Sequence, residues 1–316
     1  MEKISIIGCG TMGHSIALAA AWEGFPVKLI GMNEADLETA KTGLQNKLTV
    51  MMENELIDLN EIEKIRRNIE LSTSLEEMVS TSDFIFEVIP EQIELKRVLY
   101  KKLEGLVSDR CILASNTSGF KPSELAKEMK HPNRFIVTHF WNPAHLIPLV
   151  EVVKGEHTDE RTIEEVMQLL EQMNKKPILL KKEITGFIGN RLQYALFREA
   201  QYLLDIGAAT KEDIDAAVTY SIGRRLPITG PLMTADMGGL DVFSAISNYL
   251  FSELSTAQQS GETLTQLVSE KHLGDKNGRG FYEWDEKTSK EVNEERERTL
   301  IHFLKNDRNN REEESE

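Results

Sequence analysis

Near its start the chain reads Ile4-Ser5-Ile6-Ile7-Gly8-Cys9-Gly10-Thr11-Met12-Gly13, and a helical run of small and apolar residues from Ser15 to Trp22 follows. A β-rich run, a GxGxxG loop and a helix in this order are the fingerprint of a dinucleotide-binding unit. Gly8 permits the tight turn, Gly10 lets the backbone approach a pyrophosphate, and Gly13 lets helix and strand pack closely. The pyrophosphate would lie at the helix N-terminus. The stretch predicts an α/β domain that binds a nucleotide cofactor; the alternative is a glycine turn without a ligand.

The second strand, predicted over residues 26–30, ends without a usual feature of such domains. An Asp or Glu about twenty residues after the glycines usually binds the adenine ribose hydroxyls. Gly31 stands at that place, so either Asn33 or Glu34 substitutes or the ribose is held loosely. Without an acid NADP is less excluded, yet no Arg stands nearby to favour a 2′-phosphate. NAD is therefore the favoured cofactor.

Two further buried runs, residues 83–89 and 111–114, read as strands that end in polar residues. The ligands of open parallel sheets gather at the carboxyl ends of strands. This rule places Glu91 and Lys96 near the cofactor. The polar cluster at residues 115–119 is a candidate for holding a reacting oxygen, although the same residue types also cap helices.

A histidine and a carboxylate come together in the next part of the chain. Residues 135–138 and 149–153 read as short buried strands, and a hairpin-like connection between them brings His139 beside Glu151. A buried carboxylate on one ring nitrogen fixes the imidazole tautomer and stabilises the imidazolium that forms when the other nitrogen accepts a proton. His139 is therefore the candidate general base and Glu151 its orienting partner. His145 is the nearest competitor for the role of base.

The second half of the chain has a different pattern. After a last strand near residues 176–180 no strand alternation recurs, and a domain boundary is expected near Ile184. In the charged segment at the end, one exposed helix is expected around Leu300 to Leu304, followed by disorder. We thus expect a Rossmann-type α/β domain over residues 1–184, an all-α domain over residues 185–284 and a charged, mobile tail over residues 285–316.

Composition narrows the classes of function. The chain has 316 residues, 40% of them hydrophobic, which is enough for two domains with a sizeable core. A net charge of −15 disfavours nucleic acid as a partner. Cys9 and Cys111 have no metal-type spacing, and the histidines and acids form no ligand set for a metal. With neither an apolar leader nor an apolar run of membrane-spanning length, a soluble cytoplasmic protein without a membrane partner is expected.

Six motifs together give the chain a family resemblance. They are GCGTMG at 8–13, ASNTSG at 114–119, HFWNP at 139–143, LVEVV at 149–153, GFIGNR at 186–191 and GDKNGRGFY at 274–282. In this order they resemble the L-3-hydroxyacyl-CoA dehydrogenase family, which includes the bacterial 3-hydroxybutyryl-CoA dehydrogenases, as far as about Trp284. The resemblance implies an N-terminal Rossmann domain that binds NAD and a helical C-terminal domain that carries the contacts of a homodimer.

The resemblance also assigns roles to residues. It makes His139 the catalytic base with Glu151 as its partner, and it gives Ser118 and Asn190 polar contacts to the substrate. For the cofactor it points to Gly8, Gly10, Thr11, Met12, Gly13, Glu91, Lys96, Asn116, Asn142 and Lys276. The implied reaction is the reversible, NAD-dependent oxidation of the 3-hydroxyl of an L-3-hydroxyacyl-CoA to the 3-oxoacyl-CoA, as in fatty acid metabolism.

A second substrate class stays open. Residues 146–151 and 190–195 look like the branch that acts on free 3-hydroxy acids, namely gulonate dehydrogenase, carnitine dehydrogenase and the related λ-crystallin. A CoA enzyme needs cations for phosphates, for which Lys41 or Lys47 are candidates.

A free acid would need one cation close to the base, for which Arg191 or Arg225 could serve. A third reading is a catalytically silent, crystallin-type protein that only binds the nucleotide. The intact pair of His139 and Glu151 argues against it.

Overall fold

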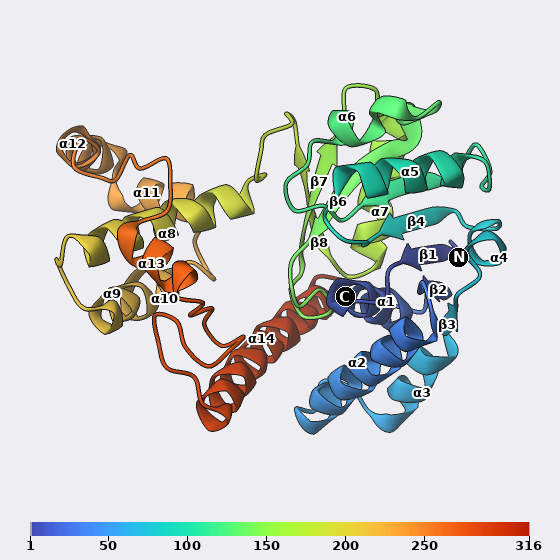
Figure 1. Ribbon diagram of the computed structural model, residues 1–316, viewed down its shortest axis with the longest axis horizontal. Coiled ribbons are helices and arrows are strands. Elements are labelled where there is room, and N and C mark those ends of the chain that lie inside the picture. The colour runs from blue at the N-terminus through green and yellow to red at the C-terminus, as the bar shows by residue number, and fades with distance from the viewer. Residues whose placement is uncertain (1, 316) are drawn as a thin grey trace. The chain divides into compact units, whose positions relative to one another are not determined.

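The computed structural model describes residues 2–315, and an eight-stranded sheet forms the centre of its N-terminal part (Figure 1). The strand order is β3-β2-β1-β4-β5-β6-β7-β8. The strands are β1 (Ile4–Ile7), β2 (Val27–Ile30), β3 (Ile69–Ser72), β4 (Phe84–Glu87), β5 (Ile112–Ser115), β6 (Phe135–Phe140), β7 (Leu149–Lys154) and β8 (Lys176–Leu180). Every neighbouring pair is parallel except β6 and β7, which are antiparallel. The predicted α/β fold with a Rossmann-type sheet is confirmed.

Helices cover both faces of this sheet, because side chains alternate along each strand. Ile4 and Ile6 of β1 pack in one apolar core with residues of α1, α2, α3 and α7, whereas Ile7 packs in a second core with residues of α4, α5 and α6. The helices are α1 (Thr11–Trp22), α2 (Glu34–Glu53), α3 (Leu59–Arg67), α4 (Leu75–Val79), α5 (Ile93–Glu104), α6 (Pro122–Leu125) and α7 (Glu160–Gln172), with short 3-10 turns η1 (Ala126–Glu128) and η2 (Pro132–Arg134).

The glycine loop between β1 and α1 has the geometry that its sequence predicts. Gly8 has a φ of +119°, a conformation that side chains disfavour. A Cβ atom on Gly13 would lie 1.8 Å from the carbonyl oxygen of Gly8, so the helix could not begin this close to the strand with any other residue. Around Gly10, in contrast, no atom lies within 4 Å of such a Cβ. The loop is therefore tightly packed at Gly8 and Gly13 and has open space beside Gly10.

A separate unit, Gly189–Glu294, is helical. Residues 189–294 form no β-strand and contain only isolated β-bridges around Arg279. The break between the units falls after Ile188, four residues beyond the expected boundary near Ile184. Its helices are α8 (Gly189–Asp205), α9 (Lys211–Ala217), the π-helical turn η3 (Val218–Ile222), α10 (Gly223–Arg225), α11 (Pro231–Gly238), α12 (Leu240–Leu250) and α13 (Glu262–Ser269).

The C-terminal segment differs from the expected mobile tail. It forms one helix, α14 (Glu286–Ser315), and its residues from Glu295 onward belong to the unit that contains the sheet. Ile301 and Leu304 are buried in a cluster with Leu146. Arg308 forms an ion pair with Glu23 at 2.8 Å, and its guanidinium lies 3.9 Å from the centre of the Trp22 ring. The charged composition of the segment does not predict this packing, because a surface helix needs only a narrow apolar stripe to pack against a core.

Across residues 2–315, no helix combines the length and the apolar character that crossing a membrane requires.

Candidate active site

His139 and Glu151 face each other across β6 and β7. They are direct partners in the antiparallel register, and Nδ1 of His139 lies 2.8 Å from Oε2 of Glu151. Glu151 is fully buried and His139 is 7% exposed. The expected pairing of the two strands is confirmed, and its register alone brings the imidazole to the carboxylate.

Hydrogen-bond donors from different parts of the chain surround the carboxylate of Glu151. Besides His139, the indole Nε1 of Trp141 donates to Oε2 at 3.2 Å, and the backbone N–H of Ile188 donates to Oε1 at 2.8 Å. Hydrogen bonds of this kind stabilise the ionised form of a carboxylate. An ionised Glu151 can only accept, so Nδ1 of the neutral ring keeps its proton and donates to Oε2, which leaves the ring's lone pair on Nε2. Nε2 is the atom that can accept a proton from a substrate.

Aromatic side chains line the imidazole. The ring centres of Trp141 and Phe187 lie 5.5 Å and 5.6 Å from that of His139. Phe187 is fully buried and has a φ of +51°, in the left-handed region. A water-poor setting of this kind strengthens the electrostatic coupling between imidazole and carboxylate.

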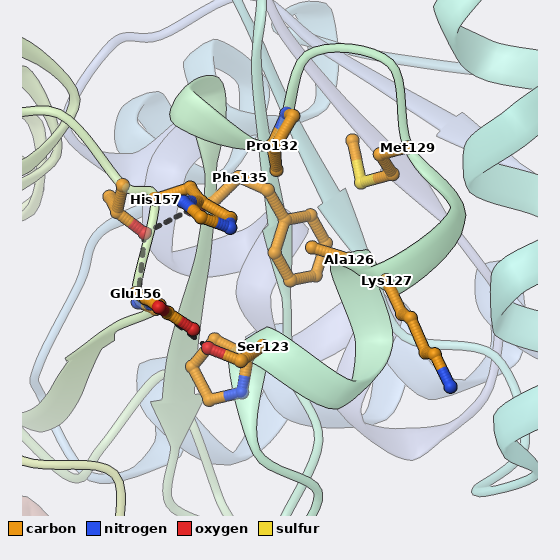
Figure 2. Close-up of a pocket in the computed structure, with 11 residues that line it drawn as sticks. Ser123, Ala126, Lys127, Met129, Pro132, Phe135, Glu156 and His157 are labelled. Carbon is orange, nitrogen blue, oxygen red and sulfur yellow. Dashed lines mark hydrogen bonds between the residues drawn. The ribbon is translucent and has the colours of Figure 1, made fainter.

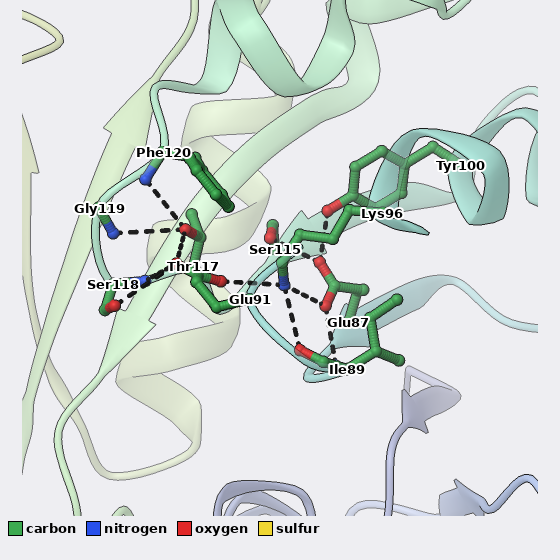
Figure 3. Close-up of polar contacts among 10 residues, drawn as sticks. All are labelled: Glu87, Ile89, Glu91, Lys96, Tyr100, Ser115, Thr117, Ser118, Gly119 and Phe120. Atoms are coloured by element: carbon green, nitrogen blue, oxygen red, sulfur yellow. Dashed lines mark hydrogen bonds and ion pairs between the residues drawn. The ribbon is translucent and has the colours of Figure 1, made fainter. Parts of the chain in front are cut away.

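A second polar cluster lies at the carboxyl ends of β4 and β5 (Figure 3). The ammonium of Lys96 is buried and contacts two carboxylates, Glu87 at 2.6 Å and Glu91 at 3.3 Å. Oε1 of Glu91 in turn accepts from the backbone N–H of Ser118 at 3.0 Å and from the hydroxyl of Thr117. The structure therefore brings together three of the predicted residues, Glu91, Lys96 and Ser118.

Glu87 is a member of this cluster that the sequence reasoning missed. It is fully buried and also accepts from the hydroxyl of Ser115 at 2.7 Å and from that of Tyr100. Burial raises the pKa of Tyr100, and the negative charge of Glu87 raises it further. The sequence does contain a signal for this role, since Glu87 is an acid within the apolar run 83–89. A charged side chain is almost never fully buried without a partner, so its position predicts a buried ion pair.

The other predicted residues of this unit have distinct surroundings. The side-chain oxygen of Asn116 accepts from the backbone N–H of Phe140 at 2.8 Å, which ties the end of β5 to the strand of His139. Asn142 is exposed and precedes Pro143 through a cis peptide bond.

The glycine loop offers the donors that a pyrophosphate requires. Gly10, the N-cap residue of α1, provides no side-chain cap for the helix, so the first-turn N–H groups keep their capacity to bind an anion. Thr11 and Met12 form that first turn. Together with the open space around Gly10, these residues fit the pyrophosphate of NAD.

Two predicted residues belong to the helical unit. Asn190 is the second residue of α8, and Lys276 is exposed in the glycine-rich turn between Gly274 and Gly280.

His145, the other candidate for the role of base, has different contacts from His139. Its Nδ1 lies 2.9 Å from the hydroxyl of Ser15, and it is 2% exposed. Burial and then the nearby cations, Lys47 first, hold the pKa of His145 well below its usual value. No carboxylate contacts its ring among the interactions of the described residues, which distinguishes it from His139.

A pocket of about 340 Å³ lies elsewhere on this unit (Figure 2). Phe135, at the start of β6, lines this pocket. Two other lining residues are joined by a hydrogen bond, in which the hydroxyl of Ser123 accepts from the backbone N–H of Glu156 at 2.9 Å. His139 lies near the other end of the same strand. The pocket is therefore apart from the carboxyl ends of the parallel strands, where cofactors of such sheets bind.

A GxGxxG loop at the start of α1 and a buried histidine–carboxylate pair are the features of a dinucleotide-dependent oxidoreductase. Comparison with known families agrees. The chain matches the model of the 3-hydroxyacyl-CoA dehydrogenase NAD binding domain over residues 3–184 and that of the 3-hydroxyacyl-CoA dehydrogenase C-terminal domain over residues 186–284. The chain belongs to the 3-hydroxyacyl-CoA dehydrogenase family and is an NAD-dependent dehydrogenase, as its motifs predict.

Individual relatives differ in the substrates that they are named for. A 5-formyl-3-hydroxy-2-methylpyridine 4-carboxylate 5-dehydrogenase of Mesorhizobium japonicum is 31% identical over 301 residues, 95% of this chain and 96% of the relative. A probable 3-hydroxybutyryl-CoA dehydrogenase of Bacillus subtilis is 34% identical over 290 residues, 92% of this chain and 99% of the relative. A solved structure of the pyridine carboxylate dehydrogenase superposes with a TM-score of 0.89 at 30% identity, covering 96% of this chain and 99% of the other.

Proposed function

We propose that the chain oxidises a hydroxyl group with His139 as general base and Glu151 as the residue that orients it. The observation that carries this proposal is the buried contact of 2.8 Å between Nδ1 of His139 and Oε2 of Glu151. With Nδ1 bound to the carboxylate, Nε2 accepts the hydroxyl proton while the carbon that bears the hydroxyl loses a hydride. Bound NAD supplies the hydride acceptor. In the reverse direction the imidazolium returns the proton to the carbonyl oxygen.

The remaining site residues are proposed to position the reactants. Ser118 contacts Glu91 and through it the buried Lys96, so this cluster can orient a polar group at the carboxyl end of β5. Asn190 is proposed to contribute a further polar contact to the substrate.

For the substrate, we propose a small free acid rather than a CoA thioester. Both lysines considered for CoA phosphates have partners in this chain. Lys41 pairs with Glu38, and the ammonium of Lys47 lies 3.2 Å from Nε2 of His14. Burial lowers the pKa of Lys47, and the negative charge of Glu297 on α14 opposes this effect.

The relatives add support for a free acid. The two family domains end at residue 284, and α14 begins at Glu286. The match to the pyridine carboxylate dehydrogenase leaves out at most 15 of 316 residues, fewer than the 32 that follow residue 284. It therefore extends into the helix that carries Glu297 beside Lys47. A 3-hydroxyacyl-CoA, the second candidate, is supported by the family as a whole and by the 3-hydroxybutyryl-CoA relative.

A panel of substrates tests this choice. We expect kcat/KM with NAD or NADH to be at least about tenfold higher on a free acid than on acetoacetyl-CoA, because one lost charge contact to phosphate is worth about 1.4 kcal/mol or more. The panel contains acetoacetyl-CoA, acetoacetate, gulonate, carnitine and 5-formyl-3-hydroxy-2-methylpyridine 4-carboxylate. A preference for acetoacetyl-CoA would contradict the free-acid proposal. Binding of NADH without turnover of any compound would instead favour the catalytically silent reading.

We also propose that a second copy of the chain covers an apolar surface on the helical unit. The surface is formed by exposed side chains of α11 and α12, among them Leu232, Met237 and Tyr249, which are 83%, 75% and 65% exposed. Apolar patches of this kind mark protein contacts, and a two-fold dimer is the commonest homo-oligomer.

Light scattering is expected to give twice the chain mass of 35.9 kDa. The double variant Leu232→Lys and Met237→Lys should shift the protein toward the monomer, because buried charges without partners are costly. Val98→Lys is the matched control, since Val98 is also apolar and exposed, on α5. A monomeric parent protein, or dissociation by the control variant alone, would refute the proposed interface.

A further inference from the structure

The end of β2 carries a glycine, and is crowded by side chains, at the position where dinucleotide-binding domains usually carry an acid. A Cβ atom on Gly31 would lie 2.8 Å from Cδ2 of Leu37, 3.0 Å from Cβ of Asp36 and 3.1 Å from Sγ of Cys9. Contacts under 3.0 Å require a neighbour to move. A side chain at position 31 would therefore displace Leu37, and Asp36 and Cys9 already lie beside that position.

That residue is Asp36, in the first turn of α2. Its Oδ2 accepts from the backbone N–H of Met32 at 2.9 Å, so the side chain turns back toward the end of β2. Asp36 is also close enough to the glycine loop to act on Cys9: burial raises the pKa of Cys9 to about 11, and the charge of Asp36 contributes to the rise. Asp36 Cβ and Cys9 Sγ also lie 3.0 Å and 3.1 Å from the same point beside Gly31, so Asp36 is close to both the end of β2 and the loop after β1.

The two residues that the sequence offered as substitutes are less suitable. The side-chain oxygen of Asn33 caps α2 by accepting from the backbone N–H of Asp36 at 3.0 Å, so it is already engaged. Glu34 is exposed, and among the hydrogen bonds of residues 2–315 it makes none with the end of β2 or with the glycine loop. Asp36, in contrast, is half-buried, and among the hydrogen bonds of residues 2–315 only Met32 donates to its carboxylate, at Oδ2.

We propose that Asp36 binds the adenine ribose hydroxyls of NAD in place of the missing strand-end acid and thereby selects NAD over NADP. A carboxylate accepts hydrogen bonds from ribose hydroxyls and repels a 2′-phosphate. The nearest basic side chain along α2, Lys41, lies five residues further along the helix and contacts Glu38. The proposal rests on the binding of NAD and not on the proposed substrate.

The test is equilibrium binding of NADH and NADPH, followed by nucleotide fluorescence without any substrate. Asp36→Asn keeps an oxygen for the Met32 N–H and removes the charge. We expect the Kd of NADH to rise by about tenfold to a hundredfold, the range for a lost hydrogen bond to a charged group. We expect the Kd of NADPH to stay the same or fall, so that the preference for NADH shrinks by at least about tenfold.

Glu34→Gln is the matched control, because it removes an acid from the same helical turn, and both Kd values should stay nearly unchanged. Asp36→Ser provides a second variant with a short acceptor, and a thermal melt verifies that each variant is folded. An unchanged ratio of the two Kd values in folded Asp36→Asn and Asp36→Ser would overturn the proposal. A loss of preference in Glu34→Gln that equals the loss in Asp36→Asn would also overturn it. Because no substrate is present, neither result bears on the proposed reaction.

Discussion

Replacement of His139 with glutamine is expected to lower kcat by about 10²-fold to 10⁴-fold, the usual contribution of a positioned general base. Glutamine keeps a polar side chain at this buried position and can still contact Glu151, but it has no nitrogen that accepts a proton near neutral pH. The Kd of NADH should remain nearly unchanged, because His139 lies on β6 while the glycine loop follows β1. Stopped-flow turnover and nucleotide fluorescence measure the two quantities on the same preparation.

The same experiment on His145 separates the two histidines. His145→Gln also alters a buried imidazole, but one that contacts the hydroxyl of Ser15 instead of a carboxylate. Its effect on kcat should be much smaller than that of His139→Gln. Full turnover in His139→Gln, or a larger loss in His145→Gln, would remove His139 from the role of base.

The parts of the fold that could be predicted are those that local sequence determines. The glycine loop is one, because steric contacts within a few residues require Gly8 and Gly13. The pairing of β6 with β7 is another: two short apolar runs joined by a short loop set the register that places His139 opposite Glu151. Both features could be predicted because they depend on the types of a few residues and on contacts between residues that are close in the sequence.

Other features depend on contacts between distant parts of the chain. β3 is a short edge strand whose residues are only partly buried, so its composition gave no clear signal. The packing of α14 involves Ile301 and Leu146, which are far apart in sequence. The ion pair of Glu87 with Lys96 joins a strand to the following helix and becomes visible only when both are buried together.

The end of β2 illustrates a third kind of difficulty. The sequence correctly indicates that Gly31 cannot supply an acid, yet it offers only neighbouring residues as substitutes. The turn of Asp36 back onto the N–H of Met32 depends on the exact start of α2, which Asn33 sets as its cap. Helix ends are the least certain element of any prediction from sequence.

Glu151→Gln is expected to lower kcat by about 10³-fold to 10⁴-fold although the side chain keeps its shape, as in other histidine–carboxylate pairs in which an amide imposes the wrong tautomer. The donors to this carboxylate include groups on His139, Trp141 and Ile188. An amide has only one oxygen, so it cannot accept both from the donors at Oε2, on His139 and Trp141, and from the N–H of Ile188 at Oε1. If its oxygen stays with the N–H of Ile188, its NH₂ group faces His139, which must then accept at Nδ1 and carry its proton on Nε2.

The opposite orientation of the amide keeps the oxygen toward His139 but sets NH₂ against the backbone N–H of Ile188. Either orientation leaves one donor without an acceptor, the Trp141 indole N–H in the first and the Ile188 N–H in the second. An unpaired buried donor costs about 1–3 kcal/mol, so Glu151→Gln should reduce thermal stability as well as turnover. Nitrogen-15 NMR of the histidine ring distinguishes a positioning role from a merely structural one, because the Nε2 resonance should move to the protonated range in Glu151→Gln. Glu151→Asp, which keeps the charge, should recover part of kcat. If the tautomer and kcat both stayed as in the parent protein, Glu151 would not be coupled to the base, and the buried contact to His139 would serve the fold alone.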